Sequence, residues 1–356
     1  MPHSELQSAQ SVDLSLYRMP AEWEPHEATW LAWPLNQETW PEPYLAPTQD
    51  TFAFLIAHLT PYEKVHLLIP EHEIENLTQK LVTHSIYDAA NLHLHHWPYD
   101  DSWMRDAGPI FVKNASAEAS TLVAHNFIFN SWGEKYSPWK DDNEIPLKAG
   151  QYLKTPTLNH SLVLEGGSIE VNGEGDLITT RQCLLSPNRN PHLNQTNIES
   201  YLCKNLGCDR IHWLGQGIEG DDTDGHIDDI ARFVSPCKIV AAVEHNKSDP
   251  NFEPLKNNLK QLAKLKLANH QSLEVLEIPM PQKRLENPFG RSPASYANFY
   301  IANNIVFVPT YSDPNDERAL TILQDAFPER KVMGRDCRSL VVGLGSIHCI
   351  TQQQPL

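Results

Sequence analysis

The sequence predicts an α/β protein in which five strand-hairpin and helix units form a pseudo-symmetric ring around a central site. One observation is a recurring unit: a polar residue opens an apolar-rich strand, a turn follows, and a second strand returns. Another is that successive units begin at similar intervals, at Asp106, Glu165, His226, Ser295 and Cys349. Amphipathic segments separate several of these hairpins. Repetition of this kind is typical of closed or stacked repeat architectures.

Alternating and continuous apolar runs predict the strands of each unit. The expected hairpins are 106–112 with 121–129, 165–171 with 176–180, 226–234 with 238–243, and 295–301 with 305–309. The last strand, 344–350, has no returning strand after it. The N-terminal run 28–33 is expected to supply that partner and close the ring.

Apolar residues at helical spacing predict helices between the strands. They fall within 52–59, 74–81, 198–206 and 252–262, and after Asp313-Pro314, which reads as a cap followed by proline at the first helical position. With 356 residues, of which 40% are hydrophobic, the chain is expected to form a single catalytic domain over 19–356 after a loosely held tail at 1–18.

The charge balance of 28 basic against 45 acidic residues gives −17. This balance argues against nucleic acid and anionic membranes as partners and favours cationic small molecules. No apolar run is long enough to span a bilayer, and no export signal is visible, so a cytoplasmic location is expected. The six cysteines lack metal-like spacing and are expected to be reduced thiols.

Residues 219–229 hold six carboxylates and one imidazole, a density that favours a cationic ligand. A helix–loop–helix calcium site is excluded, because the twelfth position counted from Asp221 is Arg232 rather than a glutamate. A zinc site is disfavoured because the stretch has one histidine. His226 and Asp228 stand two apart, so on a strand they would share a face as a proton-transferring pair. The remaining acids are expected to form a solvated turn.

The polar residues at the strand starts would meet at the axis of the ring. They combine carboxylates, an imidazole and a thiol, from Asp106, Glu165, His226, Asp228 and Cys349. A lone cysteine is more often a small core residue. Cys349, however, follows glycines that permit close approach and precedes a polar tail. His348 would face the opposite side of an extended segment and is expected to be structural.

Five motifs carry a resemblance that covers about residues 18 to 354. They lie at 20–34, 101–109, 164–169, 220–228 and 345–349. Together they resemble the agmatine deiminases of the bacterial-type peptidylarginine deiminase family, within the guanidine-modifying superfamily. The resemblance implies a five-bladed α/β propeller, no metal or organic cofactor, and hydrolysis of agmatine to N-carbamoylputrescine and ammonia in polyamine metabolism.

The resemblance also implies roles for residues. Cys349 matches the nucleophile and His226 the general acid/base. The carboxylates that hold the guanidinium match Asp106, Asp228 and Glu165, and Trp103 matches an aromatic lining the substrate channel. A bound cation would favour the Cys349 thiolate, and Asp228 should favour a charged His226.

Substrate choice rests on weaker signals. Asp222 could meet the distal ammonium of agmatine. An arginine-specific relative would need an arginine for the substrate carboxylate, and Arg105 and Arg232 are the candidates near the motifs. Three alternatives stay open: hydrolysis of free or peptidyl arginine or amidino transfer by the same chemistry, a metal-dependent hydrolase, and a non-catalytic polyamine-binding ring. The sequence leaves the oligomeric state undecided and is compatible with a homo-oligomer.

Overall fold

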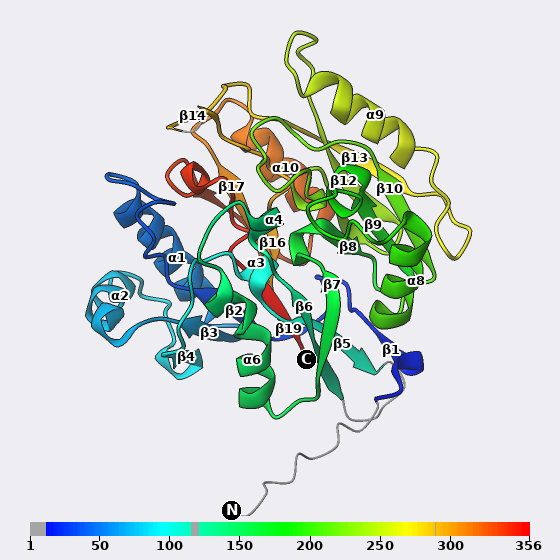
Figure 1. Ribbon diagram of the computed structural model, residues 1–356. Helices are drawn as coiled ribbons and strands as arrows, with labels where there is room; N and C mark the ends of the chain where they lie inside the picture. Colours follow the sequence, from blue (N-terminus) through cyan, green and yellow to red (C-terminus); the bar gives the residue numbers. More distant parts are fainter. Residues whose placement is uncertain (1–11, 115–120, 289) are drawn as a thin grey trace, which may run out of the picture.

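The computed structural model describes residues 12–114, 121–288 and 290–356. Small sheets surround a central region in which the short helices α3 (Met104–Ala107) and α4 (Ser131–Glu134) lie, and the longer helices lie outside them (Figure 1). This arrangement confirms the predicted mixed α/β class.

Five sheets share one strand order, in which an antiparallel pair is extended by a third strand parallel to the second. They consist of β5 (Ile110–Asn114), β6 (Leu122–Ile128) and β7 (Thr157–Val163); β8 (Ile169–Val171), β9 (Asp176–Thr180) and β10 (Arg210–Leu214); β11 (Ala231–Ser235), β12 (Lys238–Val243) and β13 (Glu274–Pro279); β16 (Tyr300–Ile301), β17 (Ile305–Thr310) and β18 (Lys331–Asp336); and β19 (Gln352–Pro355), β2 (His26–Ala32) and β3 (Lys64–Leu68). The short strand β1 (Tyr17–Arg18) adds to β5, β4 (Leu92–His95) adds to β3, and β14 (Glu286–Asn287) pairs with β15 (Gly290–Arg291).

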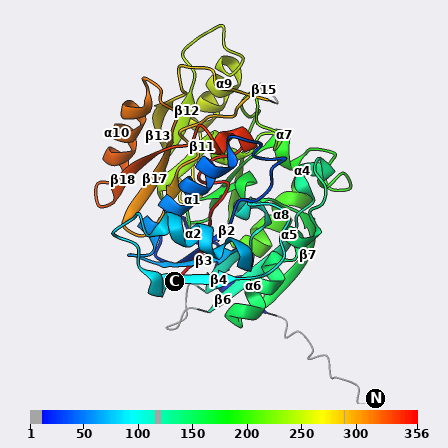
Figure 2. The ribbon, with the colours of Figure 1, turned by 90° about the vertical axis from the view of Figure 1, so that its left-hand side faces the viewer.

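Each parallel pair of strands is joined through a helix, as parallel pairing requires. These crossover helices are α1 (Leu45–Leu59), α2 (Ile74–Leu81), α6 (Ile145–Leu153), α8 (Gln195–Leu206), α9 (Phe252–Leu262) and α10 (Asp316–Ala326). Figure 2 shows α1 and α2 on the outer side of the molecule. The predicted helices are confirmed, although α10 begins at Asp316, beyond the expected Asp313-Pro314 start.

Short helical turns connect the remaining segments. They are η1 (Leu14–Leu16), η2 (Glu71–Glu73), η3 (Ala89–Asn91), α5 (Lys140–Asn143), η4 (Gly166–Ser168), α7 (Arg181–Leu184), η5 (Ile227–Asp229) and η6 (Leu340–Gly343). Two of them, η4 and η5, occupy positions at which the sequence predicted the start of a strand.

The two ends of the chain meet in one sheet. β19 pairs antiparallel with β2, with Gln352 opposite Trp30. The predicted pairing of the N-terminal run with the C-terminal strand is therefore observed, but that strand is the polar segment 352–355 and not 344–350. At the N-terminus, residues 1–11 of the predicted tail lie outside the described residues. Residues 14–18 form η1 and β1, so the described part of this stretch is paired to the domain rather than loose.

The largest buried apolar cluster draws residues from Leu31 to Ile350 and includes side chains of α1, β12 and β17. In the part of the chain that the structure describes, no helix combines the length and the apolar character of a membrane span.

Candidate active site

Short turns, and not strands, carry the residues predicted for the site. Asp106 lies in α3 ahead of β5, Glu165 directly precedes η4 and β8, and His226 and Asp228 lie at η5 ahead of β11. Cys349 lies in a turn ahead of β19. The prediction that these residues open strands is wrong, because the backbone turns just before each first strand. The prediction that equivalent positions of different units converge agrees with the contacts described next.

Three of these side chains meet at Gly167. Its N–H donates to Asp106 Oδ1 at 2.9 Å. A Cβ added at this glycine would lie 2.6 Å from His226 Nδ1, 2.8 Å from Asp106 Oδ1 and 3.1 Å from Asp228 Oδ2. Only a glycine leaves room for these groups. The carboxylates of Asp106 and Asp228 therefore lie near the His226 imidazole, with Asp106 Oδ1 3.7 Å from His226 Nδ1.

Cys349 joins this group. Its Sγ lies 3.8 Å from Asp228 Oδ2, and Asn298 Nδ2 donates to the sulfur at 3.1 Å. A Cβ at Gly345 would lie 2.4 Å from Cζ3 of Trp103 and 3.1 Å from Cys349 Cβ, which places the indole of Trp103 beside the nucleophile candidate. Asn298 lies just before β16, the first strand of its sheet, and the other site residues also lie just before the first strands of their sheets. This shared position in the repeat is the signal that could have identified Asn298 from the sequence.

Trp132 is a further residue of the site, and no pattern in the sequence indicated it. Its Nε1–H donates to Asp106 Oδ2 at 2.9 Å, and its ring meets Trp103 edge to face at 6.4 Å. The backbone of Trp132 has φ 56°, a left-handed conformation that is uncommon for a bulky residue. This turn therefore holds an indole over the site.

Glu165 is fully buried and forms an ion pair with Arg189 at 2.9 Å through Oε1. Arg189 also pairs with Asp224, which belongs to the acid-rich residues 219–229, called the acidic loop below. Glu165, Cys183 and His226 each offer one possible metal-ligand atom, and these atoms lie within 4.8 Å of one another. Among the described residues, this is the one group of side chains with the spacing of a metal site. The guanidinium of Arg189, already bonded to Glu165, opposes a second cation there.

Burial dominates the protonation states at the site. It raises the pKa of Asp106 well above its usual range, with the charges of Asp228 and Glu165 adding to the effect. The pKa of Cys349 is likewise raised by burial and by the charges of Asp228, Asp229 and Asp106. Burial lowers the pKa of His226 to about 3, although Asp228 acts in the opposite direction. Asp228 therefore favours the charged form of His226, as expected, but desolvation outweighs the carboxylate in the ligand-free protein.

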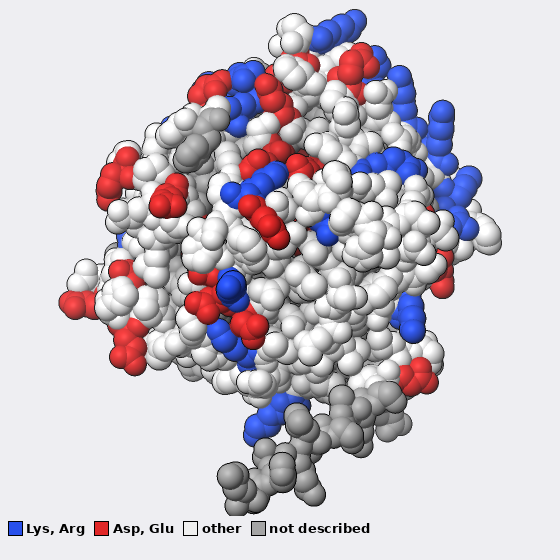
Figure 3. All heavy atoms as spheres, in the orientation of Figure 1, with Lys and Arg blue, Asp and Glu red and all other residues white. Residues whose placement is uncertain are grey.

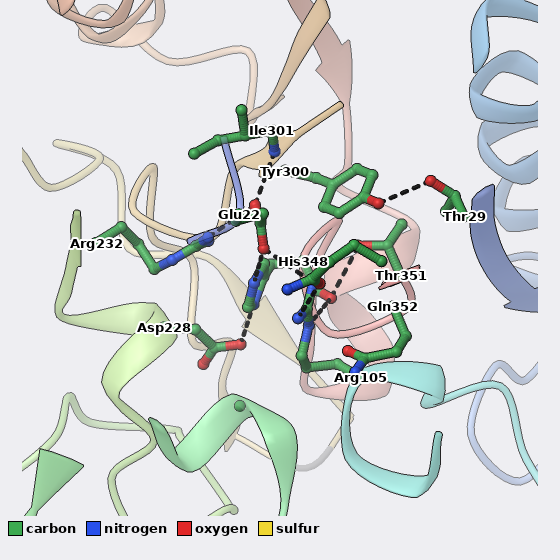
Figure 4. Close-up of polar contacts among 12 residues, drawn as sticks. Glu22, Thr29, Arg105, Asp228, Arg232, Tyr300, Ile301, His348, Thr351 and Gln352 are labelled. Carbon is green, nitrogen blue, oxygen red and sulfur yellow. Dashed lines mark hydrogen bonds and ion pairs between the residues drawn. The ribbon is translucent and has the colours of Figure 1, made fainter. Parts of the chain in front are cut away.

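A buried network lies behind Asp228 (Figure 4). His348 Nδ1 lies 2.7 Å from Asp228 Oδ2, and His348 Nε2 lies 2.9 Å from Glu22 Oε2. Glu22 also forms ion pairs with Arg105 at 3.0 Å and with Arg232 at 2.8 Å. His348 therefore connects Asp228 to this network, and both arginines that were candidates for a substrate carboxylate are bound to buried acids.

The acidic loop closes against α4 and the residues that follow it. Asp221 organises the loop by accepting hydrogen bonds from the backbone N–H groups of Thr223, Gly225 and His226 at 2.7, 2.8 and 3.1 Å. Asp222 is partly exposed and bonds to Lys135 and Tyr136, so it faces a cation and a phenol rather than open solvent. Charges of both signs gather near the middle of this face (Figure 3).

Comparisons with known proteins agree with this geometry. Residues 18–355 match the Porphyromonas-type peptidyl-arginine deiminase family. The chain is 36% identical over 363 residues to the agmatine deiminase of Pseudomonas fluorescens, covering 95% of each chain, and 36% identical over 361 residues to that of Pseudomonas aeruginosa, again covering 95% of each. Its fold is similar to that of the agmatine deiminase of Enterococcus faecalis, with a TM-score of 0.89, 31% identity, and 96% and 97% of the two chains covered.

Proposed function

The chain belongs to the Porphyromonas-type peptidyl-arginine deiminase family, and on this premise we propose that it hydrolyses agmatine to N-carbamoylputrescine and ammonia, a step toward putrescine. The observation that carries the proposal is the meeting of Cys349 with Asp228, and of Asp228 with His226 and Asp106 around Gly167. A thiol, an imidazole and carboxylates in one buried place suit a flat cation better than a neutral substrate.

The guanidinium would take the place between the carboxylates. Burial and the charges of Asp228 and Glu165 raise the pKa of Asp106. A bound cation would offset the cost of burying these carboxylates and the repulsion between them. Asp106 and Asp228 would grip the nitrogens of the substrate through charge-assisted hydrogen bonds and aim its carbon at Cys349 Sγ. Glu165 would orient His226 from the other side.

Catalysis would begin when the bound cation lowers the pKa of Cys349 and the thiol proton moves to the neutral His226. The thiolate attacks the guanidinium carbon, and His226 gives the proton to a nitrogen that leaves as ammonia. A thiouronium on Cys349 remains. His226 then takes a proton from water, whose oxygen attacks the same carbon and releases the ureido product and the sulfur. The neutral imidazole of the free protein is the form that this order of steps requires.

Arg105 and Arg232 support agmatine over arginine, because both are engaged by buried glutamates and neither is free to pair with a substrate carboxylate. Trp103, beside Cys349, would line the channel along the methylene chain. Asp222 would receive the distal ammonium, in competition with Lys135.

The wider proposals follow the same premise. The five sheets of common strand order, with β19 paired to β2, support a closed five-bladed α/β propeller that makes residues 19–356 one catalytic domain. We propose a cytoplasmic enzyme that acts without a metal or organic cofactor. Neither nucleic acid nor a membrane is a proposed partner, and self-association into a homo-oligomer is compatible with the proposal.

Ammonia release tests the function directly. The wild type and Cys349→Ala are compared on agmatine, on arginine and on an arginine peptide, with and without chelator. The proposal expects release from agmatine alone, insensitive to chelator and lost in Cys349→Ala. Release from arginine or the peptide would identify one of the related deiminases. Chelator-sensitive release that survives Cys349→Ala would identify a metal-dependent hydrolase, and agmatine binding without release would identify a binding protein.

A further inference from the structure

Two thiols outside the site meet at the C-terminal end of α8. Gly207 ends this helix with φ 64°, and its N–H donates to the carbonyl of Cys203 at 3.1 Å. In such a cap the residue after the left-handed glycine commonly folds back onto the last turn of the helix. That residue is Cys208, and its Sγ lies 3.6 Å from Sγ of Cys203. The sequence Cys-Lys-Asn-Leu-Gly-Cys thus places the two thiols in contact through the helix cap.

The two thiols differ in exposure. Cys203 is half-buried and Cys208 is 7% exposed. Both line a surface hollow of about 680 Å³, whose other walls come from residues 12–18 and from Lys204, Gly207 and Asp209. A small reagent can therefore approach the pair from the hollow, and Cys203 is the more exposed of the two thiols.

The pKa values of the two thiols also differ, and the more exposed thiol is the more acidic one. The hydrogen bond from the Cys208 thiol lowers the pKa of Cys203, although burial and the charges of Glu199 and Asp209 oppose this. The same contact, together with burial, raises the pKa of Cys208. A more acidic, more accessible thiol beside a buried one is the usual arrangement of an attacking and a resolving cysteine.

We propose that Cys203 and Cys208 form a redox modification site that closes to an intramolecular disulfide. The oxidant is a low-molecular-weight disulfide such as oxidised glutathione. The Cys203 thiolate attacks one of its sulfurs and releases one thiol, which leaves a mixed disulfide. The Cys208 thiolate then attacks Cys203 Sγ and releases the second thiol. The two cysteines lose two electrons and two protons, and the oxidant becomes two thiols.

The geometry requires only a small adjustment for this step. An S–S bond is about 2 Å long, so the two sulfurs at 3.6 Å have to approach by less than about 2 Å in total. Among the described residues, none of the other cysteines has a hydrogen-bonding contact with a second cysteine. Cys183 and Cys337 are fully buried, whereas Cys237 is half-buried. Cys237 is therefore the matched control for a thiol of similar exposure.

Peptide mapping tests the proposal with the folded full-length protein. Trypsin cuts after Lys204, between the two cysteines, so a disulfide joins peptide 190–204 to peptide 205–210. The protein is incubated with oxidised glutathione, alkylated and digested without reductant. The proposal expects this joined pair in most molecules of the wild type, of Cys237→Ser and of Cys349→Ala, and its disappearance on adding dithiothreitol. In Cys208→Ser a glutathione adduct should accumulate on Cys203.

Two results would overturn the proposal. One is the absence of the joined peptides at an oxidant concentration that already modifies Cys237. The other is their appearance only in urea, which would mean that the folded protein holds the thiols apart. The readout does not involve ammonia release, so it stands or fails independently of the proposed deiminase activity.

Discussion

His348 Nδ1 lies 2.7 Å from Asp228 Oδ2, on the side of Asp228 that is turned toward the buried network of Glu22, Arg105 and Arg232. Asp228 Oδ1 is buried and lacks a hydrogen-bond partner among the described residues. Burial alone would raise the pKa of Asp228, yet the hydrogen bond with His348, together with the charge of Arg232, lowers it below its usual value. The carboxylate is thus held ionised with one oxygen free for a ligand.

Replacing His348 with alanine should weaken the hold on the substrate. The loss of a hydrogen bond to a buried carboxylate predicts a fall of about ten- to hundredfold in kcat/KM for agmatine, mostly through KM. His348→Asn keeps a donor near the Nδ1 position and should lose less. Steady-state kinetics on the two variants check this order. Equal losses in both, or a loss confined to kcat, would contradict the assigned positioning role.

Gly167→Ala tests the convergence of the site on one glycine. The added methyl would lie 2.6 Å from His226 Nδ1 and 2.8 Å from Asp106 Oδ1, so one of these groups must move. We expect a loss of at least about a hundredfold in kcat/KM, because small misplacements at a reacting centre cost that much. Gly215→Ala is the control, since a Cβ there would lie 3.4 Å from Asn258 Oδ1 and 3.8 Å from Gln261 Nε2, which are ordinary contact distances. Near-normal activity of Gly167→Ala would show that the three groups do not act together.

Asp229→Asn should make Cys349 ionise at lower pH. The carboxylate of Asp229 contributes to the raised pKa of Cys349, after burial and Asp228, and an asparagine can still accept the 3.0 Å hydrogen bond from Asn298. Iodoacetamide alkylates the thiolate, so its reaction rate with Cys349 rises with pH. In Asp229→Asn this rise should occur about one pH unit lower than in the wild type. Asp336→Asn, which removes an exposed carboxylate, serves as the control. A profile that stays in place or moves to higher pH would be inconsistent with this electrostatic account.

Arg189→Met should destabilise the fold. The Arg189 side chain is fully buried and neutralises Glu165, so its removal leaves an unpaired buried carboxylate. The expected loss in the free energy of unfolding is about 3 to 5 kcal/mol, measured by urea denaturation. Arg338→Met removes an exposed pair with Asp336 and should cost less than about 1 kcal/mol. Burial raises the pKa of Glu165, so the loss in Arg189→Met should shrink as the pH falls and this carboxyl becomes neutral. A loss as small as in Arg338→Met would argue against a buried ion pair.

The sequence predicted the larger features of the fold because they depend on patterns along the chain. Apolar periodicity identified the crossover helices other than α6, and the recurring hairpin identified the antiparallel pair of each repeated sheet. The turns before each first strand escaped prediction, since a run such as 226–234 reads as one continuous strand. The 3-10 turn at Ile227–Asp229 brings His226 and Asp228 next to Gly167, which lies ahead of another sheet. Long-range contacts of this kind leave no periodic signal.

The site was predicted in part for a similar reason. Cys349, Asp106 and Asp228 stand at equivalent places of a repeat, so their proximity follows from the repeat. Trp132 and Glu22 reach the site from outside that pattern. Burial cannot be read from the residue types alone, and it is burial that makes His226 neutral despite the nearby Asp228.

The central claim is that Cys349 forms a covalent intermediate with the guanidinium carbon. Intact-mass and peptide mass spectrometry on the wild type, quenched with acid during turnover of agmatine, test it most directly. The account predicts an added mass equal to agmatine minus ammonia, located on the peptide that carries Cys349 and absent in Cys349→Ala. Turnover without any adduct on that peptide, together with ammonia release by Cys349→Ala, would contradict it.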